Sequence, residues 1–202
     1  MPTSVIIVDD FLQDPCALRE SALKLTYPTQ DAMFAGRNSF ERLGISGLAE
    51  QVFRLVGEEL APIEPLHSHG KFRITLAQDQ GRSGIHVDRS HWSGILYLSR
   101  EADCIGGTEF YRHRRTRMDR WPINRDELSA TGMTTIEDVR REILEKDSND
   151  MEKWELTMQI PMRFNRLLLL RPWFWHTAGP GFGDSLDNGR LVYLMFFAAS
   201  RA

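Results

Sequence analysis

Residues 84–98 read GIHVDRSHWSGILYL, and this stretch decides which fold we expect. In an extended segment, side chains two residues apart leave the same face of the backbone, so His86 and Asp88 can converge on one point. A carboxylate and two imidazoles form the facial triad of a non-haem iron site, and a second histidine from elsewhere would complete it. The triplet alone is a weak signal, because a His-x-Asp pair also arises by chance and forms surface hydrogen bonds. The rest of the chain has to supply the missing ligand and the scaffold.

The composition is that of one soluble globular domain. With 202 residues, 42% of them hydrophobic and 26% charged, the chain can bury a sizeable core, and we expect a single domain over residues 1–202. A net charge of -3 argues against a dedicated nucleic-acid binder. Cys16 and Cys104 are too few for a disulfide framework and predict reduced thiols. Because the N-terminus lacks a basic segment and no apolar run is long enough to span a bilayer, we expect a cytoplasmic protein.

The first third of the chain predicts one strand and two helices. Residues 5–8 form a short β-branched run that is typical of a strand. Asp14 is an expected N-cap with Pro15 at the first helical position. Ser46 is the next expected N-cap, and the helical spacing of apolar residues after it predicts a helix that ends at Pro62. We expect these helices to support a sheet.

From Phe72 the hydrophobic pattern changes to a period of two, which predicts a strand. Further short strands are expected, with loops that contain glycine between them, at residues 95–98, 108–111, 154–160, 167–170 and 190–197. The strict alternation at 154–160 predicts one buried face, made of Trp154, Leu156, Met158 and Ile160. This succession favours a β-dominated α+β fold with a barrel at its centre.

Residues 112–150 differ in character and indicate an insertion on this barrel. The segment opens with a basic run that begins at Arg112, and residues 135–138 then provide a start signal for a helix that resembles a capping box. Long insertions sit on barrel rims, where they act as lids or bind substrate. The arginines form either a solvated face or a surface that attracts an anionic substrate.

The remaining parts of the expected site follow in chain order. His176 ends one strand region and Arg190 begins the next. The segments GIHVD, SGILYLS, GGTEFY, IPMRFNRLLLLRP, WHTAGP and GRLVYLMFF occur in this order. In these segments the chain resembles the Fe(II)/2-oxoglutarate-dependent dioxygenases, and its layout is most similar to the prolyl-4-hydroxylase-like branch. The resemblance covers roughly residues 72–111 and 154–198 and implies a double-stranded β-helix, or cupin-like jelly roll, supported by N-terminal helices and carrying a helical insertion.

The resemblance also implies roles for particular residues. His86, Asp88 and His176 would hold Fe(II), which leaves three coordination positions, two for 2-oxoglutarate and one for O2. Arg190 would pair with the distal carboxylate of 2-oxoglutarate, since a planar guanidinium can bind both oxygens. Asp88 favours hydroxylation, because the related halogenases lack this carboxylate. The alternatives from the residues alone are a core histidine at 176 and a salt-bridged arginine at 190.

Further contacts are expected around this centre. Three side chains are candidates for contacting the keto acid from the barrel interior: Arg73, Thr75 and Tyr97. Three others are candidates for contacting substrate: His91, Trp92 and Arg112. The first two of these follow the opening triplet and either touch substrate or cover the mouth of the barrel.

The expected activity is hydroxylation of a C–H bond in a small molecule, an amino acid, or a peptide- or carrier-tethered substrate, with release of succinate and CO2. One alternative is a cupin-type iron dioxygenase that needs no 2-oxoglutarate, in which Arg190 would bind a substrate carboxylate. Another is a metal-binding or interaction module without turnover. Phe196 stands where relatives that repair alkylated bases carry a second arginine, which argues against a nucleic-acid substrate. No membrane partner is expected, and a homodimer is left open.

Overall fold

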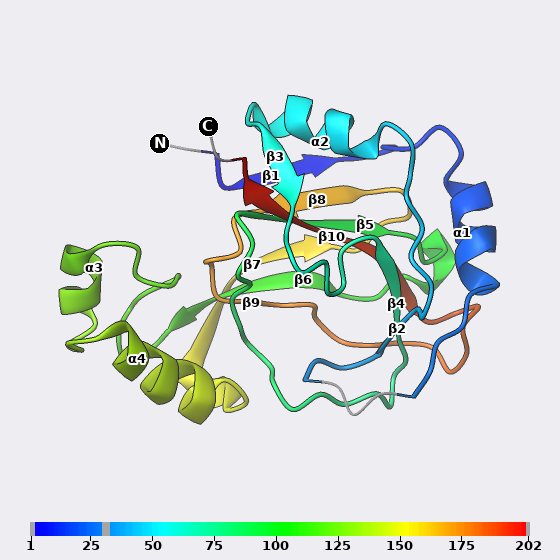
Figure 1. Ribbon diagram of the computed structural model, residues 1–202. Coiled ribbons are helices and arrows are strands. Elements are labelled where there is room, and N and C mark those ends of the chain that lie inside the picture. Colours follow the sequence, from blue (N-terminus) through cyan, green and yellow to red (C-terminus); the bar gives the residue numbers. More distant parts are fainter. Residues whose placement is uncertain (1–2, 30–32, 201–202) are drawn as a thin grey trace.

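The computed structural model describes residues 3–29 and 33–200. Seven strands form the larger sheet: β1 (Val5–Val8), β2 (Arg37–Asn38), β3 (Leu60–Pro62), β4 (Lys71–Thr75), β5 (Trp92–Tyr97), β8 (Leu167–Leu170) and β10 (Arg190–Ala199). Three form the smaller sheet: β6 (Gly107–His113), β7 (Trp154–Pro161) and β9 (His176–Thr177). All strand pairs are antiparallel, and the two sheets lie against each other (Figure 1). The β-dominated character expected from the sequence is confirmed.

The strand order brings distant parts of the chain together. The larger sheet runs β1-β8-β5-β10-β4-β2, with β3 beside β10, and the smaller sheet runs β7-β6-β9. An isolated bridge between His86 and His176 extends the smaller sheet beyond β9, with backbone hydrogen bonds of 2.9 and 3.0 Å. The two histidines therefore lie opposite each other because of the backbone pairing itself.

Helices α1 (Pro15–Leu23) and α2 (Leu48–Val56) pack on the larger sheet, as expected. Their buried side chains share the main hydrophobic core with strand residues, as shown by Ala22, Val52, Phe72, Ile74 and Leu96. Such burial of apolar surface is the main source of stability in a fold of this size. Within the described residues, no helix combines the length and apolar character needed to cross a bilayer. Cys16 and Cys104 are free thiols.

Of the two predicted helix N-caps, one is confirmed and the other is wrong. Asp14 caps α1 by accepting a hydrogen bond from the Ala17 amide at 3.0 Å, which confirms that prediction. Ser46 is not a cap: Gly47 precedes α2 with a φ of 73°, and no side chain caps the helix. The predicted end at Pro62 is also wrong, because the chain leaves α2 at Gly57, with a φ of 71°, and then forms β3. Residues 60–62, which were predicted to be helical, pair instead with the edge of β10.

Strand β7 is present as predicted, but its side chains are not buried in the predicted pattern. Trp154 and Ile160 are buried, whereas Leu156 and Met158 are 53% and 39% exposed. The pairing of β6 with β7 shifts between Phe110 and Tyr111, so the alternation that a regular strand would have is interrupted. β7 is an edge strand, and the insertion covers only its Trp154 end.

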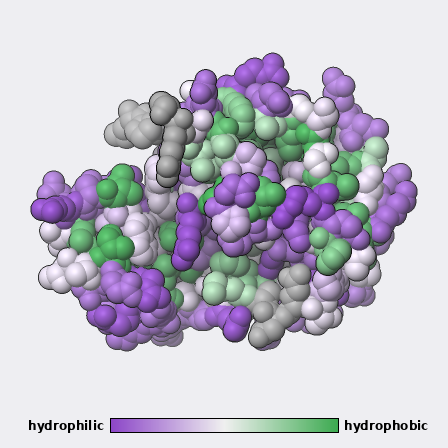
Figure 2. All heavy atoms as spheres, viewed as in Figure 1, coloured by the Kyte–Doolittle hydropathy of each residue, from purple (hydrophilic) through white to green (hydrophobic). Residues whose placement is uncertain are grey.

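The insertion contains α3 (Arg125–Ala130) and α4 (Ile136–Val139), and α4 continues into a π-helical turn at Arg140–Glu145. The capping box predicted at 135–138 is confirmed. These helices form a lobe beside the sheets, and in the view of Figure 2 hydrophilic residues cover most of it. Its apolar side chains make a second core, in which Val139 and Ile143 pack with Ile85, Tyr111 and Trp175.

His113 joins the end of β6 to the insertion and makes stability dependent on pH. It is fully buried, with its Nε2 3.0 Å from Asp147 and its Nδ1 3.1 Å from Thr116. Burial lowers the pKa of His113 below 6.5 more than Asp147 raises it. The unfolded chain then binds a proton that the folded state resists, so stability is full above pH 6.5 and is lost as the pH falls below it.

We therefore expect thermal unfolding at a lower temperature at about pH 5.5 than at about pH 7.5. Replacing His113 with glutamine, which can hydrogen-bond but does not titrate, should flatten this part of the profile. An unchanged pH dependence in that variant would contradict the assignment.

Candidate metal site and its cavity

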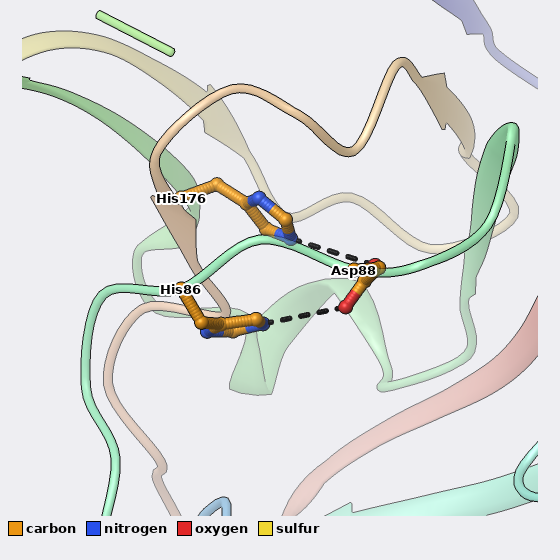
Figure 3. Close-up of side chains that lie close together, drawn as sticks. All are labelled: His86, Asp88 and His176. Atoms are coloured by element: carbon orange, nitrogen blue, oxygen red, sulfur yellow. Dashed lines mark ion pairs between the residues drawn. The ribbon is translucent and has the colours of Figure 1, made fainter. Parts of the chain in front are cut away.

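Three candidate ligands meet at one edge of the smaller sheet. His86 and Asp88 lie between β4 and β5, and His176 begins β9. Both imidazoles point toward the Asp88 carboxylate (Figure 3), and each Nε2 lies 3.7 Å from one of its oxygens. One donor atom from each residue lies within 4.8 Å of the others, close enough for one ion to contact all three. In the described part of the chain no other set of three His, Cys, Asp or Glu side chains has this arrangement.

Main-chain carbonyl groups orient both imidazoles. His86 Nδ1 lies 2.9 Å from the Gly84 oxygen, and His176 Nδ1 lies 2.8 Å from the Phe174 oxygen. Because a carbonyl oxygen can only accept a hydrogen bond, each Nδ1 carries the proton. In its neutral form, each ring then presents its Nε2 lone pair to the centre of the triad, which is the arrangement that metal-binding histidines commonly have.

The Asp88 carboxylate is also held in place. Its backbone amide donates to the Pro172 oxygen at 3.1 Å, and its Oδ2 accepts a hydrogen bond from Ser93 Oγ at 2.6 Å. Ser93 in turn lies 2.8 Å from the buried hydroxyl of Ser90. Sequence reasoning did not single out Ser93, because the strand predicted at residues 95–98 begins two residues after it, whereas β5 begins at Trp92.

We expect the Ser93→Ala protein to bind a divalent metal about tenfold more weakly, since losing an outer hydrogen bond to a ligand typically costs about 10–100-fold in affinity. Calorimetric titration with Co(II) would measure this affinity. Ser39→Ala removes another buried hydroxyl, which bonds to backbone groups away from the triad, and should match the wild type. Equal affinities in the two variants would contradict the role given to Ser93.

The electrostatics of the triad suit a cation. Burial and the neighbouring His176 lower the pKa of His86 to about 4. Burial opposes ionisation of Asp88, but His176, His86 and Ser93 outweigh it and lower its pKa to about 2. For His176, burial opposes protonation, but the Asp88 carboxylate outweighs it and raises the pKa. At neutral pH the site therefore offers an ionised carboxylate and a neutral His86.

A cavity of about 150 Å³ adjoins the triad. Alternate residues of β10 point into it along its length: Arg190, Val192, Leu194 and Phe196. Ser93 and Ile95 of β5 and Thr108 of β6 line it as well, and its lining as a whole is largely apolar. The triad lies on its wall together with Arg190, which means that one small molecule could contact both.

Arg190 is the most unusual group in this cavity. It is only 2% exposed, and its Nε and Nη2 atoms have no hydrogen-bond partner among the described residues. Its guanidinium lies 5.9 Å from the centre of the Tyr97 ring. Burial lowers its pKa, yet an arginine keeps its charge at neutral pH. Because a buried cation with free donors is costly, this site is suited to an anion that accepts from both nitrogens.

The other candidates for cofactor contact have distinct positions. Arg73 lines the cavity, but backbone carbonyl groups occupy its guanidinium. Thr75 pairs with Arg190 across β4 and β10 and borders a second cavity of about 330 Å³. Tyr97 is fully buried, with its hydroxyl 2.7 Å from Thr108.

The structure does not bring the three substrate candidates to the triad. Trp92 is fully buried in the main core, because alternation along β5 turns Ser93 toward the cavity and Trp92 away from it. His91 lies 2.7 Å from Glu58 and 2.5 Å from Arg171. Arg112 lies 3.8 Å from Glu155, in a separate surface hollow. None of the three lines the cavity beside the triad, and their contact with a substrate stays a prediction.

Sequence reasoning missed Phe34, which contacts the triad directly. Its ring centroid lies 4.2 Å from that of His86. It comes from an irregular segment without a periodic pattern, so no sequence signal points to it. Trp175, next to His176 in the chain, is fully buried in the second core.

A family model described as "Family of unknown function (DUF6445)" matches residues 2–197. The chain belongs to this family. No curated protein matches its sequence. Likeness to solved structures therefore carries the remaining comparison.

Three solved structures share the fold. HygX from Streptomyces hygroscopicus, with nickel, 2-oxoglutarate and hygromycin B bound, is 12% identical over 98% of this chain and 84% of its own, with a TM-score of 0.54. A prolyl hydroxylase from Trichoplax adhaerens, in complex with a hypoxia-inducible-factor peptide, is 13% identical over 97% and 84%, with a TM-score of 0.50. SnoK, a non-haem α-ketoglutarate-dependent carbocyclase of nogalamycin biosynthesis, is 12% identical over 98% and 86%, with a TM-score of 0.50. The fold is therefore one that 2-oxoglutarate-dependent enzymes use.

Proposed function

We propose that this protein is an Fe(II)- and 2-oxoglutarate-dependent oxygenase. One observation carries the proposal: the buried Arg190, with two nitrogen donors that have no partner among the described residues, shares a cavity with the His86, Asp88 and His176 triad. A dicarboxylic keto acid matches both features, since one end can chelate a metal and the other is an anion. The solved structures of the same fold support the proposal, and HygX holds nickel and 2-oxoglutarate.

The residues present fit both groups. His86, Asp88 and His176 would hold the iron through two neutral Nε2 atoms and one carboxylate. Arg190 would bind the distal carboxylate of the keto acid, with Tyr97 beneath its guanidinium. When bound, iron and 2-oxoglutarate supply an O2-dependent oxidation that converts the keto acid to succinate and CO2 and hydroxylates a C–H bond. The apolar walls from Ile95 and Val192 exclude water, which strengthens the pairing of Arg190 with a carboxylate.

The topology supports a finer assignment. The order β4-β10-β5-β8 in the larger sheet, opposed by the His86 segment, β9, β6 and β7 in the smaller, is what a double-stranded β-helix requires. We assign residues 1–202 to one domain of the prolyl-4-hydroxylase-like branch, with 112–150 as its lid or substrate-binding insertion. The substrate would be a small molecule, an amino acid, or a peptide- or carrier-tethered group, and the free cysteines fit a cytoplasmic enzyme.

The test is anaerobic reconstitution. Adding 2-oxoglutarate to the Fe(II)-loaded protein should produce a weak visible charge-transfer band, and admitting O2 should release succinate. Iron binding without the band or succinate would overturn the proposal. It would instead favour an iron dioxygenase that needs no keto acid, or a metal-binding module without turnover.

A further inference from the structure

Residues 33–36 cross one side of the candidate metal site. Phe34 lies with its ring centroid 4.2 Å from that of His86 and its ring plane inclined by 41°. It lines the cavity that holds Arg190 and also the second cavity, whose other walls include Asp79 and Asn149. Its position therefore determines how far His86 is open to either cavity.

Arg73 holds this segment. Its Nε and Nη2 donate to the Ala35 oxygen at 2.9 and 2.7 Å, and Nη2 also donates to the Phe34 oxygen at 2.5 Å. Its Nη1 donates to Asn38 Oδ1 at 2.8 Å. Burial and the nearby Arg190 lower the pKa of Arg73 to about 10, so it stays charged at neutral pH. The guanidinium that was expected to bind the keto acid is thus occupied by the protein's own backbone.

The backbone around the segment leaves little freedom. The Ser83 amide donates to the Met33 oxygen at 2.8 Å. Gly36 has a φ of 93°, and a Cβ there would lie 2.4 Å from the Ile74 oxygen. Neighbouring carbonyl oxygens that converge on one point repel one another and lose hydration, so they need a cation or strong donor between them. Arg73 supplies that donor.

We propose that Arg73 is a positioning residue that holds Phe34 against His86, closing one side of the metal site to water, and that it does not bind 2-oxoglutarate. The catalytic consequence rests on the proposed oxygenase function, whereas the structural role of Arg73 does not. With Phe34 in place, little water reaches the site, and keto acid is consumed only slowly in the absence of substrate.

The structural role is tested first on the metal-free protein. In Arg73→Gln and Arg73→Lys, we expect the amides of residues 33–38 to exchange hydrogen about tenfold faster than in the wild type. Lysine keeps the charge but cannot bond to two carbonyl groups and Asn38 in one plane. Arg163→Gln, which removes an exposed arginine paired with Asp9, is the matched control and should leave this exchange unchanged. Wild-type exchange in both Arg73 variants would overturn the proposal.

The catalytic role is tested on the iron-loaded protein. Phe34→Ala and Arg73→Gln should each increase succinate release without substrate severalfold, and the double variant should not exceed the larger single effect. The KM for 2-oxoglutarate should stay within about twofold of the wild type. A large rise in this KM in Arg73→Gln, with rescue by Arg73→Lys, would overturn the proposal and make Arg73 a cofactor ligand. If the wild type forms neither the charge-transfer band nor succinate, the oxygenase proposal fails, and hydrogen exchange alone decides the structural role.

Discussion

Replacing His176 with alanine is expected to abolish iron binding and, with it, succinate release. Among the described residues, the polar partners of the ring are the Phe174 carbonyl and Asp88, and its Nε2 faces the triad. Its loss removes one of three donors and leaves the partly buried Asp88 carboxylate with one imidazole fewer to compensate its charge. We expect the metal affinity to fall by more than the roughly 10–100-fold that loss of a supporting hydrogen bond costs. His86→Ala should have the same effect.

Calorimetric titration with Co(II) or Fe(II), together with metal analysis of the purified protein, measures this effect. His67→Ala is the control, because His67 is exposed and lies outside the triad. Circular dichroism confirms that the variants are folded. Metal affinity within a few-fold of the wild type in either triad variant would show that the metal binds elsewhere.

Replacing Arg190 with glutamine is expected to weaken the binding of 2-oxoglutarate without affecting the binding of iron. Iron binding should be unchanged, since Arg190 is not one of the three candidate ligands. The KM for 2-oxoglutarate should rise by about 100-fold or more, because a buried carboxylate loses its charged partner, which typically costs about 3–5 kcal/mol. Steady-state succinate release as a function of 2-oxoglutarate concentration measures this change.

The same substitution is not expected to destabilise the protein when no ligand is bound. Because Arg190 is a buried cation without a partner for Nε and Nη2 among the described residues, glutamine removes a desolvation cost. The melting temperature without ligand should therefore be equal to or above that of the wild type. A lower melting temperature together with an unchanged KM would mean that Arg190 serves the fold and not the cofactor.

Elements whose signals are local were predicted correctly. Asp14 and the amide it caps lie within one helical turn, and the capping box at 135–138 is equally compact, so neither depends on the rest of the fold. The strand period from Phe72 was also sufficient, because one face of β4 packs on the main core.

Features that depend on contacts with distant segments of the chain were not predicted. The apolar spacing after Ser46 continues beyond Val56, yet the chain leaves α2 there because β10 offers an edge with which β3 pairs. Leu156 and Met158 follow the pattern of a buried face but lie on an edge strand that the insertion covers only in part. In each case the outcome depends on which distant segment is present, and no local pattern contains that information.

The sequence by itself determined which donors the candidate site has: two imidazoles, one carboxylate and one guanidinium, on segments whose order indicates how they meet. Only the tertiary structure decided that both Nε2 atoms face Asp88, that Arg190 lacks a partner and that Arg73 is occupied by the backbone of Phe34 and Ala35. The physical reason is that donor chemistry belongs to a residue type, whereas its partners come from remote backbone that takes its place only when the two sheets form.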